Sequence, residues 1–451
     1  CVENLPTHST PKEAKKLAVT LNVNCVKVKK APHWDYAFYN FHNEEERIAA
    51  VATFDGAPYR GKKLKAYLAH ASVDPMEQNN VKRRRVDPNK PDYSDKPLLE
   101  QLAYKVTPLW AEPYERQLIK KRRVLSKELK KATKDTNRLK WAQDGMKLYQ
   151  GCICLLEDVI GSPVLDAYRN NSEFSVGLGL NDEITVGHLL GAYLDGVIQV
   201  VEVDACKHLS PQAKFMAKTV QTFIRTSTFP ILDRQSHKGF WRCLRVRQNI
   251  GGDVMAVMFV QKTDIEEEKV NEELKKFQEH ILTTAKANDI NIVSIYSIHD
   301  SSLSGAGEQP AENVELLYGV PCLVETMGGL KFQIAPQAFF QVNTKAAETL
   351  MDVVRSSSDI GAETTLLDVC CGTGTIGLSL AKSVKRVIGI DICESSVINA
   401  RKNAELNGIS NCEFIAGKAE DTIEAVLKKS KEGSGDVFAI VDPPRSGLYS
   451  S

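Results

Sequence analysis

The sequence lacks an apolar run long enough to cross a bilayer. A spanning helix needs about 18 to 20 consecutive apolar residues, and no stretch of the 451 residues reaches that length. A charged-then-apolar signal segment is also absent at the start of the chain, where Cys1 stands instead of Met. We therefore expect a fragment of a longer protein, without a membrane partner.

A metal-binding cysteine pattern is missing as well. The eleven cysteines are scattered along the chain, and Cys152 and Cys154 are too close together for a CxxC pair. Cys370 and Cys371 are adjacent but lie inside a glycine-rich motif. We expect reduced thiols of an intracellular protein and no bound metal.

Neither sign of charge dominates the composition. With a net charge of +1 and a pI near 7.6, the chain does not attract a polyanion uniformly, so a nucleic-acid partner must bind local basic patches. The length of 451 residues and the hydrophobic content of 43% predict two or three domains.

The first 73 residues predict a small domain with the element order βαββαβ. Thr10 and Glu13 form a capping-box pattern in front of its first helix, which is expected over residues 11–21. The other elements are expected at residue 2 and at residues 25–30, 36–42, 44–53 and 64–69.

Aromatic residues alternate along the third strand of this domain. Trp34, Tyr36 and Phe38 share one face, where exposed rings suit base stacking. The run resembles the RNP1 signature of an RNA-recognition motif, although Trp34 replaces the usual basic residue and Asp35 replaces glycine. The resemblance implies RNA binding through Tyr36 and Phe38. A ferredoxin-like domain whose aromatic face binds a protein is the alternative.

Residues 74–97 are polar, proline-rich and basic, as in an exposed linker between domains. The basic run at residues 82–85 is compatible with a nuclear-import signal, with a phosphate contact or with an ordinary solvated segment.

A helical and β-rich central region is predicted over residues 98–338. Its helix at residues 114–139 combines an apolar stripe, which includes Leu125 and Ala132, with a dense row of cations. A packed helix with an ordinary charged face is the alternative to an RNA-binding ridge. Strands are expected at residues 197–203, 241–246 and 254–260, and a helix at 266–288. The RNA-binding candidates in the row are Lys120, Lys121, Arg122 and Arg123.

From residue 339 to residue 451 the chain alternates strands and helices, which predicts an α/β fold with a doubly wound, Rossmann-like parallel sheet. The first strand leads into the turn DVCCGTGTIG at residues 368–377, and Asp391 ends the next strand. The motif DPPR at residues 442–445 ends a later strand. Ligands bind at the carboxyl ends of such strands, so the three segments predict a cofactor site, and CGTG favours S-adenosylmethionine over NAD.

Four segments together resemble the uracil-C5 RNA methyltransferase family: YRNNSEF at 168–174, FFQVN at 339–343, DVCCGTGTIG and DPPR. The resemblance implies S-adenosylmethionine as methyl donor, a uridine in the tRNA T-loop as target, and a location in the cytosol, the nucleus or both. Some members hold an iron–sulfur cluster, but its ligand cysteines are absent here, so no cluster is expected. Carried over by position, the cofactor contacts are Gln341, Cys370, Gly372, Thr375, Asp391 and Asp442, with Glu420 as a weaker candidate.

The chemistry of the family requires a thiolate that adds to C6 of uracil, attack of C5 on the methyl group, and removal of the C5 proton by a carboxylate. The family supplies both groups from segments beyond DPPR, whereas this chain ends at Ser451. We therefore assign no catalytic residue within the chain and expect the fragment alone to be inactive.

Two other functions stay open at this point. An amino-group methyltransferase would end its acid-Pro-Pro motif in an aromatic that stacks on the target base, but Arg445 occupies that position. A tRNA-binding or folding factor would use the α/β module only as a scaffold.

Overall fold

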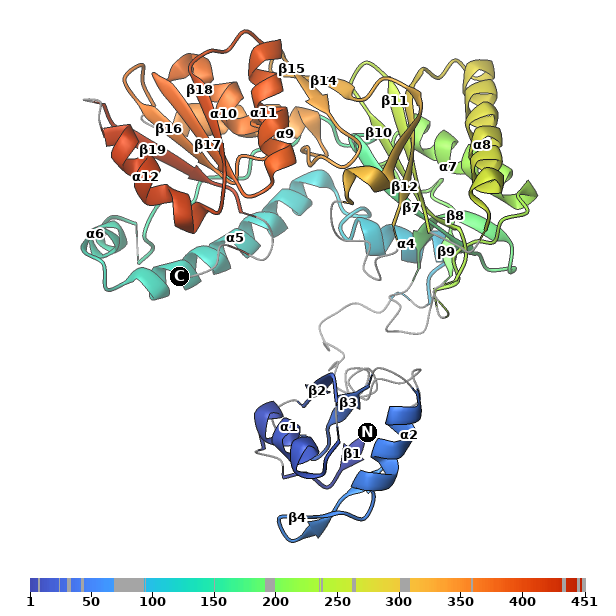
Figure 1. The fold of residues 1–451 in the computed structure, drawn as a ribbon. Coiled ribbons are helices and arrows are strands. Elements are labelled where there is room, and N and C mark those ends of the chain that lie inside the picture. The colour runs from blue at the N-terminus through green and yellow to red at the C-terminus, as the bar shows by residue number, and fades with distance from the viewer. Residues whose placement is uncertain are drawn as a thin grey trace. The chain divides into compact units, whose positions relative to one another are not determined.

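The computed structural model divides the chain into two compact units, Cys1–Pro91 and Asp92–Ser451 (Figure 1). The basic run at residues 82–85, most of the predicted linker and Arg445 lie outside the described residues. The structure describes residues 1–6, 9–23, 25–30, 34–41, 44–68, 93, 95–149, 151–190, 199–234, 236, 238–261, 265–300, 309–357, 360–431, 435–443 and 447.

The first unit has the predicted alternation of strands and helices, with one additional short hairpin. Strand β1 pairs with β6 and β2 pairs with β3, while Val2 bridges to Ala37 beside β3, so the strand order is β6-β1-β3-β2 and every pair is antiparallel. The elements are β1 (Val2–Glu3), α1 (Pro11–Thr20), β2 (Lys27–Lys29), β3 (Phe38–Asn40), α2 (Glu44–Phe54), the hairpin β4 (Pro58–Tyr59) and β5 (Lys62–Lys63), and β6 (Lys65–Ala66).

Helix α1 begins where the capping box predicts. The Glu13 amide donates to Thr10 Oγ1 (3.2 Å), and the Thr10 amide donates to Glu13 Oε2 (2.8 Å). Both bonds satisfy amides that have no partner within the helix. The helices cover one face of the sheet, where Tyr39 from β3 packs against Phe54 from α2 with ring centroids 4.7 Å apart.

The second unit begins with three helices: α4 (Leu98–Val106), α5 (Tyr114–Thr136) and α6 (Lys140–Leu148). Figure 1 shows α6 at the far end of the long helix α5. The predicted apolar stripe on this helix is wrong at Leu125 and Ala132, which are exposed, while Thr133 is buried. Thr133 instead makes a contact on this half of α5, because its hydroxyl accepts from the Ile153 amide in the segment after α6.

A seven-stranded sheet with the order β13-β12-β11-β10-β7-β8-β9 forms the centre of the second unit. Only β11 and β12 pair in parallel. The predicted strand at residues 197–203 is reduced to two residues among those described. The elements are β7 (Asn171–Leu178), β8 (Ile184–Leu189), β9 (Val200–Val201), α7 (Pro211–Thr226), β10 (Trp241–Gln248), β11 (Val254–Val260), α8 (Glu267–Ala287), β12 (Ile292–His299) and β13 (Val314–Gly319), the last preceded by a short 3-10 turn at Ala311–Asn313.

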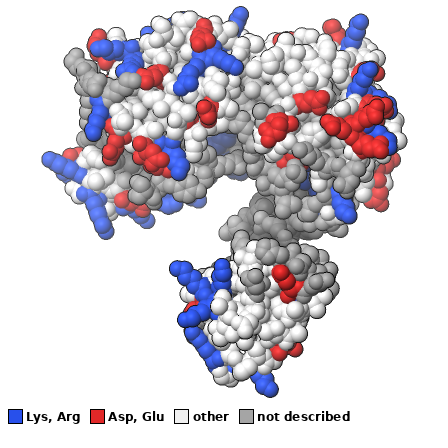
Figure 2. Space-filling view, viewed as in Figure 1, with Lys and Arg blue, Asp and Glu red and all other residues white. Residues whose placement is uncertain are grey.

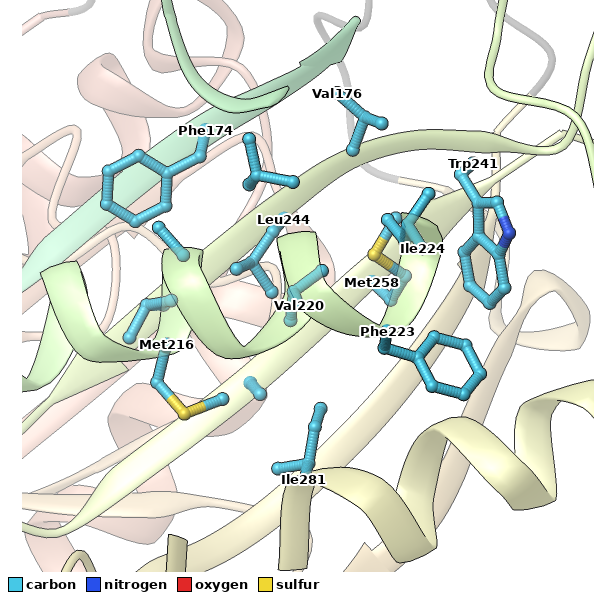
Figure 3. Close-up of a cluster of buried hydrophobic side chains, with 14 of the residues drawn as sticks. Phe174, Val176, Met216, Val220, Phe223, Ile224, Trp241, Leu244, Met258 and Ile281 are labelled. Carbon is cyan, nitrogen blue, oxygen red and sulfur yellow. The ribbon is translucent and has the colours of Figure 1, made fainter. Parts of the chain in front are cut away.

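Helices α7 and α8 bury one face of this sheet. Figure 3 shows Leu244 of β10 pointing toward Val220 of α7, with Phe174 of β7 and Ile281 of α8 in the same cluster. Aromatic rings close one end, where Trp241 and Phe223 meet edge to face at 5.8 Å. A core of this kind holds the sheet rigid. The opposite face of β11 and β12 carries a second buried cluster that includes Met255, Val257 and Ile298.

Removal of a buried methylene group from this core is expected to lower the stability of the protein measurably. Ile281→Val removes one buried methylene, so the free energy of unfolding should fall by about 1 kcal/mol. Urea denaturation measures the loss. Ile160→Val makes the same chemical change at an exposed side chain and should change stability by less than about 0.5 kcal/mol. Equal losses in the two variants would contradict the burial described here.

The predicted doubly wound parallel sheet is present at the end of the chain. Its order is β18-β17-β16-β19, and every pair is parallel. The first strand, β16, lies between β17 and β19, so the carboxyl ends of β16 and β19 flank the point where ligands bind in such sheets. A hairpin, β14 (Leu323–Met327) and β15 (Leu330–Ile334), precedes the module. The elements are α9 (Thr344–Ser357), β16 (Thr365–Val369), α10 (Thr375–Leu380), a 3-10 turn (Ala381–Ser383), β17 (Arg386–Asp391), α11 (Glu394–Leu406), β18 (Cys412–Ala416), α12 (Ala419–Lys431) and β19 (Val437–Val441).

Candidate functional site

The turn between β16 and α10 is a tight loop held against the neighbouring strand. The amides of Cys370 and Cys371 both donate to the carbonyl of Ile390, at 2.8 and 3.0 Å. Gly374 adopts a φ of +79°, and a Cβ there would lie 3.0 Å from the Phe414 ring. A Cβ on Gly372 would meet nothing within 4 Å. The loop therefore needs glycine for close helix packing on one side and faces open space on the other.

Asp391, at the carboxyl end of β17, is oriented by this loop. Its Oδ2 accepts from the Gly372 amide and its Oδ1 accepts from the Cys393 amide, both at 2.8 Å. Each carboxylate oxygen has a second lone pair, so the side chain can accept further hydrogen bonds from a ligand. The geometry thus places a fixed acceptor beside the open side of the loop.

Four carboxyl groups surround the thiol of Cys370. Burial raises the pKa of this thiol, and the negative charges of Asp391, Asp368, Asp442 and Glu420 raise the pKa further. The Asp442 amide donates to the carbonyl at the end of β16 (3.3 Å), which places Asp442, the first residue of DPPR, beside the loop. The thiol is therefore protonated near neutral pH, and the site favours a positively charged ligand group.

Asp368 is a member of this group that motif reading did not single out as a site residue. It is fully buried, and its Oδ2 accepts from the Gly377 amide of α10 (2.8 Å). Within the described part of the chain its Oδ1 has no hydrogen-bond partner. Burial raises the pKa of this carboxyl to about 7, with Asp442 and Asp391 adding to the rise and the Gly377 hydrogen bond opposing it.

Asn403 was also missed by sequence reasoning. It is fully buried on α11; its Oδ1 accepts from the Gln333 amide (2.8 Å) and its Nδ2 donates to the Thr373 carbonyl (3.2 Å). One side chain thus joins hairpin β14–β15 to the glycine loop. The role of Asn403 could be predicted only from information about contacts between residues far apart in the sequence. An asparagine within a helix predicts no such contact by itself.

The backbone of the predicted cofactor residue Gln341 is anchored to the segment that precedes β7. Asn170 of YRNNSEF donates to the Gln341 carbonyl and to Thr344 Oγ1, both at 2.9 Å. Asn343 caps α9, because its Oδ1 accepts from the Ala346 amide (3.0 Å). The described hydrogen bond of Gln341 therefore connects it to the start of the seven-stranded sheet, whereas Gly372 and Asp391 bond directly to each other.

Thr375 lies at the first position of α10, directly after the glycine loop. Its hydroxyl is 3.2 Å from that of Thr373. The side chain therefore faces its neighbour within the turn, and the N-terminal amides of α10 begin at this point.

Two arginines of β10 fasten the segment that leads to Gln341. Arg245 donates to the Pro336 carbonyl (3.3 Å) and Arg247 donates to the Ala338 carbonyl. Arg247 is only 4% exposed, and burial followed by the charge of Arg245 lowers its pKa to about 9. We refer to Asn170, Arg245 and Arg247 as the sheet clamp. It fixes the backbone of this segment relative to the sheet.

The aromatic patch predicted in the first unit is assembled. Trp34 stacks on Tyr36 with centroids 4.6 Å apart and planes 18° apart, and Phe38 meets Tyr36 edge to face at 5.7 Å. The three side chains are half-buried on the face opposite to Ala37 and Tyr39, which are buried. The predicted alternation along this strand is therefore correct.

The four predicted RNA-binding cations of α5 fall into two kinds. Lys120 forms an ion pair with Glu112, and Arg122 pairs with Asp158 at 3.0 Å. Lys121 and Arg123 are exposed and have no ion pair with a described carboxylate. Figure 2 shows Lys and Arg side chains gathered at the end of the second unit where α5 and α6 lie.

No helix among the described residues has the length and apolar character of a bilayer-spanning segment. The same part of the chain contains no group of three or more His, Cys, Asp or Glu side chains placed to hold a metal ion.

Comparison with known proteins gave three kinds of match. A family described as a methyltransferase domain matches residues 360–439. The mouse (Mus musculus) tRNA (uracil-5-)-methyltransferase homolog A is 35% identical over 459 residues, which cover 100% of this chain and 72% of the mouse protein. The human (Homo sapiens) tRNA (uracil-5-)-methyltransferase homolog B is 35% identical over 353 residues, or 78% of this chain and 69% of the human protein.

Among solved structures, the Pyrococcus abyssi tRNA (uracil-54, C5)-methyltransferase in complex with S-adenosyl-L-homocysteine matches with 22% identity and a TM-score of 0.46. The match covers 64% of this chain and 62% of the archaeal one.

Proposed function

Because this chain belongs to the tRNA (uracil-5-)-methyltransferase family, we propose that it takes part in transferring a methyl group from S-adenosylmethionine to C5 of a uridine in the T-loop of tRNA. The observation that carries the proposal is the placement of Asp391 and Asp442 beside the open glycine loop. Two carboxyl groups there complement a cofactor with a positively charged sulfonium and ammonium group.

The residues at the loop fit this cofactor. Asp391 has a fixed carboxylate with acceptor capacity left for ribose hydroxyls, and Gly372 leaves space for a close approach. S-adenosylmethionine supplies an electrophilic methyl group when bound. Cys370 holds its proton, so we do not propose it as the nucleophile. The remaining proposed contacts are Gln341, Thr375 and Asp442.

For the RNA, we propose that the first unit is an RNA-recognition motif that uses Tyr36 and Phe38. The strand order β6-β1-β3-β2 and the assembled aromatic face support this. On the second unit we propose Lys120, Lys121, Arg122 and Arg123 as phosphate contacts. A location in the cytosol, the nucleus or both stays a prediction.

A methylation assay tests the proposal. The full-length protein that contains this chain is incubated with labelled S-adenosylmethionine and a T-loop transcript, and 5-methyluridine is quantified; a 5-fluorouridine transcript serves as a covalent trap. We expect methylation and a trapped adduct. RNA binding without either product would instead support the alternative of a tRNA-binding or folding factor.

The sheet clamp predicts a loss of activity without a matching loss of stability. Arg247→Met removes the donor to the Ala338 carbonyl but also removes a buried charge, so the free energy of unfolding should change by less than about 1 kcal/mol. Methylation should fall about tenfold because the Gln341 segment loses its position. Arg247→Lys should recover part of the activity. Arg225→Met, at a partly exposed ion pair with Glu183, is the control and should stay active.

A further inference from the structure

Helices α5 and α6 form an arm, residues 114–149, whose charge differs sharply from that of its surroundings. The arm holds twelve Lys and Arg residues and four Asp and Glu residues, a net charge of +8. The rest of the second unit, residues 92–113 and 150–451, holds 30 basic and 43 acidic residues, a net charge of −13. The arm therefore attracts a polyanion more strongly than the remainder of this unit does on average.

The arm has a buried interior that is formed by small residues. Ala142 is fully buried, and Thr133 is buried and accepts from the Ile153 amide at 3.3 Å. A Cβ on Gly145 would clash with the Ile153 carbonyl, so α6 packs directly on the segment that follows it. An interior this narrow has no room for large side chains.

Several large apolar side chains of the arm face outward, whereas Leu118 and Leu129 are half-buried. Trp141 is 58% exposed and Leu148 is 75% exposed. The other exposed apolar side chains on the arm are Ile119, Val124, Leu125, Leu139 and Tyr149. Rings and aliphatic side chains interleaved with cations form the kind of surface that binds bases and phosphates together.

The cations of the arm differ in whether they form ion pairs. In the first turns of α5, which we call the root of the arm, Lys120 and Arg122 pair with Glu112 and Asp158. Further out, a set of exposed cations has no ion pair with any carboxylate that the structure describes: Lys127, Lys130, Lys131, Lys134, Arg138 and Lys140. Root cations anchor the arm, and outer cations are available to a ligand.

The root also connects to the candidate site. Tyr114, the first residue of α5, accepts from the Ser162 amide through its hydroxyl (2.6 Å), and Asn343 donates to Ser162 Oγ (3.2 Å). Asn343 is the cap of α9, two residues after Gln341. A ligand held on the arm is thus held by an element that connects to the segment of Gln341 through Ser162.

We propose that the outer part of the arm is an RNA-binding surface on which Trp141 stacks against an unpaired base and the cations around Lys130 and Lys134 contact phosphates. The inference rests on the proposed function and extends it, since it moves the main contact outward from the root residues. RNA is favoured over an acidic protein because an exposed indole offers stacking to every base.

Binding measurements test this surface. The full-length protein is titrated with a labelled tRNA transcript at several salt concentrations. Trp141→Ala should weaken binding about tenfold, and Lys130→Glu/Lys134→Glu should weaken it at least tenfold and reduce the salt slope by about 2. The control Lys275→Glu/Lys286→Glu makes the same charge change at exposed positions of α8 and should bind nearly as the unmodified protein does.

Several outcomes would overturn the inference. Unchanged tRNA affinity in the arm variants would do so, and so would an equal loss in the α8 control, which would indicate a net-charge effect alone. Binding of the arm to anionic phosphatidylserine vesicles but not to tRNA would point to lipid instead. Circular dichroism of each variant verifies that the fold is intact.

The test separates this inference from the proposed function. If the arm variants lose tRNA affinity while the unmodified protein binds tRNA without methylating it, RNA binding by the arm is supported and the proposed methylation activity is rejected. If the unmodified protein methylates tRNA and the arm variants bind tRNA normally, the methylation activity is supported and RNA binding by the arm is rejected.

Discussion

Asp391→Asn is expected to weaken S-adenosylmethionine binding about 100-fold, or about 2.7 kcal/mol. Both oxygens of this carboxylate accept from backbone amides, those of Gly372 and Cys393. An asparagine has only one oxygen, so its NH₂ group would face an amide N–H and the two donors would repel each other. The substitution also removes a negative charge from the site that receives the cationic cofactor.

Isothermal titration of S-adenosylmethionine measures this loss. Asp182→Asn is a matched control, because it makes the same charge change at an exposed residue with a φ of +56°, a conformation that asparagine tolerates. Its affinity should stay within about twofold of the unmodified protein. An Asp391→Asn variant that folds and binds the cofactor normally would exclude the proposed role of this carboxylate.

Asp368→Asn is expected to change how stability depends on pH. The pKa of the buried carboxyl is about 7 in the folded chain against 3.8 for the ordinary group. Between these values the folded state holds the proton and the unfolded state releases it, so stability falls as pH rises through the window and the full penalty is present above about pH 7. Asparagine does not ionise, so this contribution disappears.

The expected difference between the two proteins is small at pH 4 and on the order of 4 kcal/mol at pH 8, with the asparagine variant the more stable. Urea denaturation at a series of pH values measures it. Asparagine keeps an oxygen for the Gly377 amide, so the α10 contact survives. Parallel pH profiles for the two proteins would indicate that Asp368 is ionised in the folded chain over the whole range.

Local signals predicted the fold well. Thr10 and Glu13 fixed the start of α1 because a capping box involves residues only three apart. The parallel module followed from alternating strands and helices, whose periodicity is also local. By contrast, the exposure of Leu125 depends on which residues lie opposite α5, and the sequence of α5 contains no information on that.

Some residues of the candidate site could likewise be predicted from local patterns, and others could not. That Gly372, Asp391 and Asp442 lie at one edge of the sheet could be predicted from motif and spacing, because consecutive parallel strands bring their carboxyl ends to one edge. Asn403 and Arg247 act through partners far away in the sequence, Gln333 and Ala338. No spacing rule connects residues of different elements that meet only after folding.

The charge segregation of the arm has a kinetic consequence. A unit with +8 on one arm and −13 elsewhere has a large electric dipole moment, and a polyanion that approaches it exerts a torque which turns the arm toward the incoming phosphates before any contact forms. Productive collisions are then a larger fraction of all collisions. The association rate constant should accordingly decrease as ionic strength rises and the Debye length shrinks to about 8 Å at physiological salt.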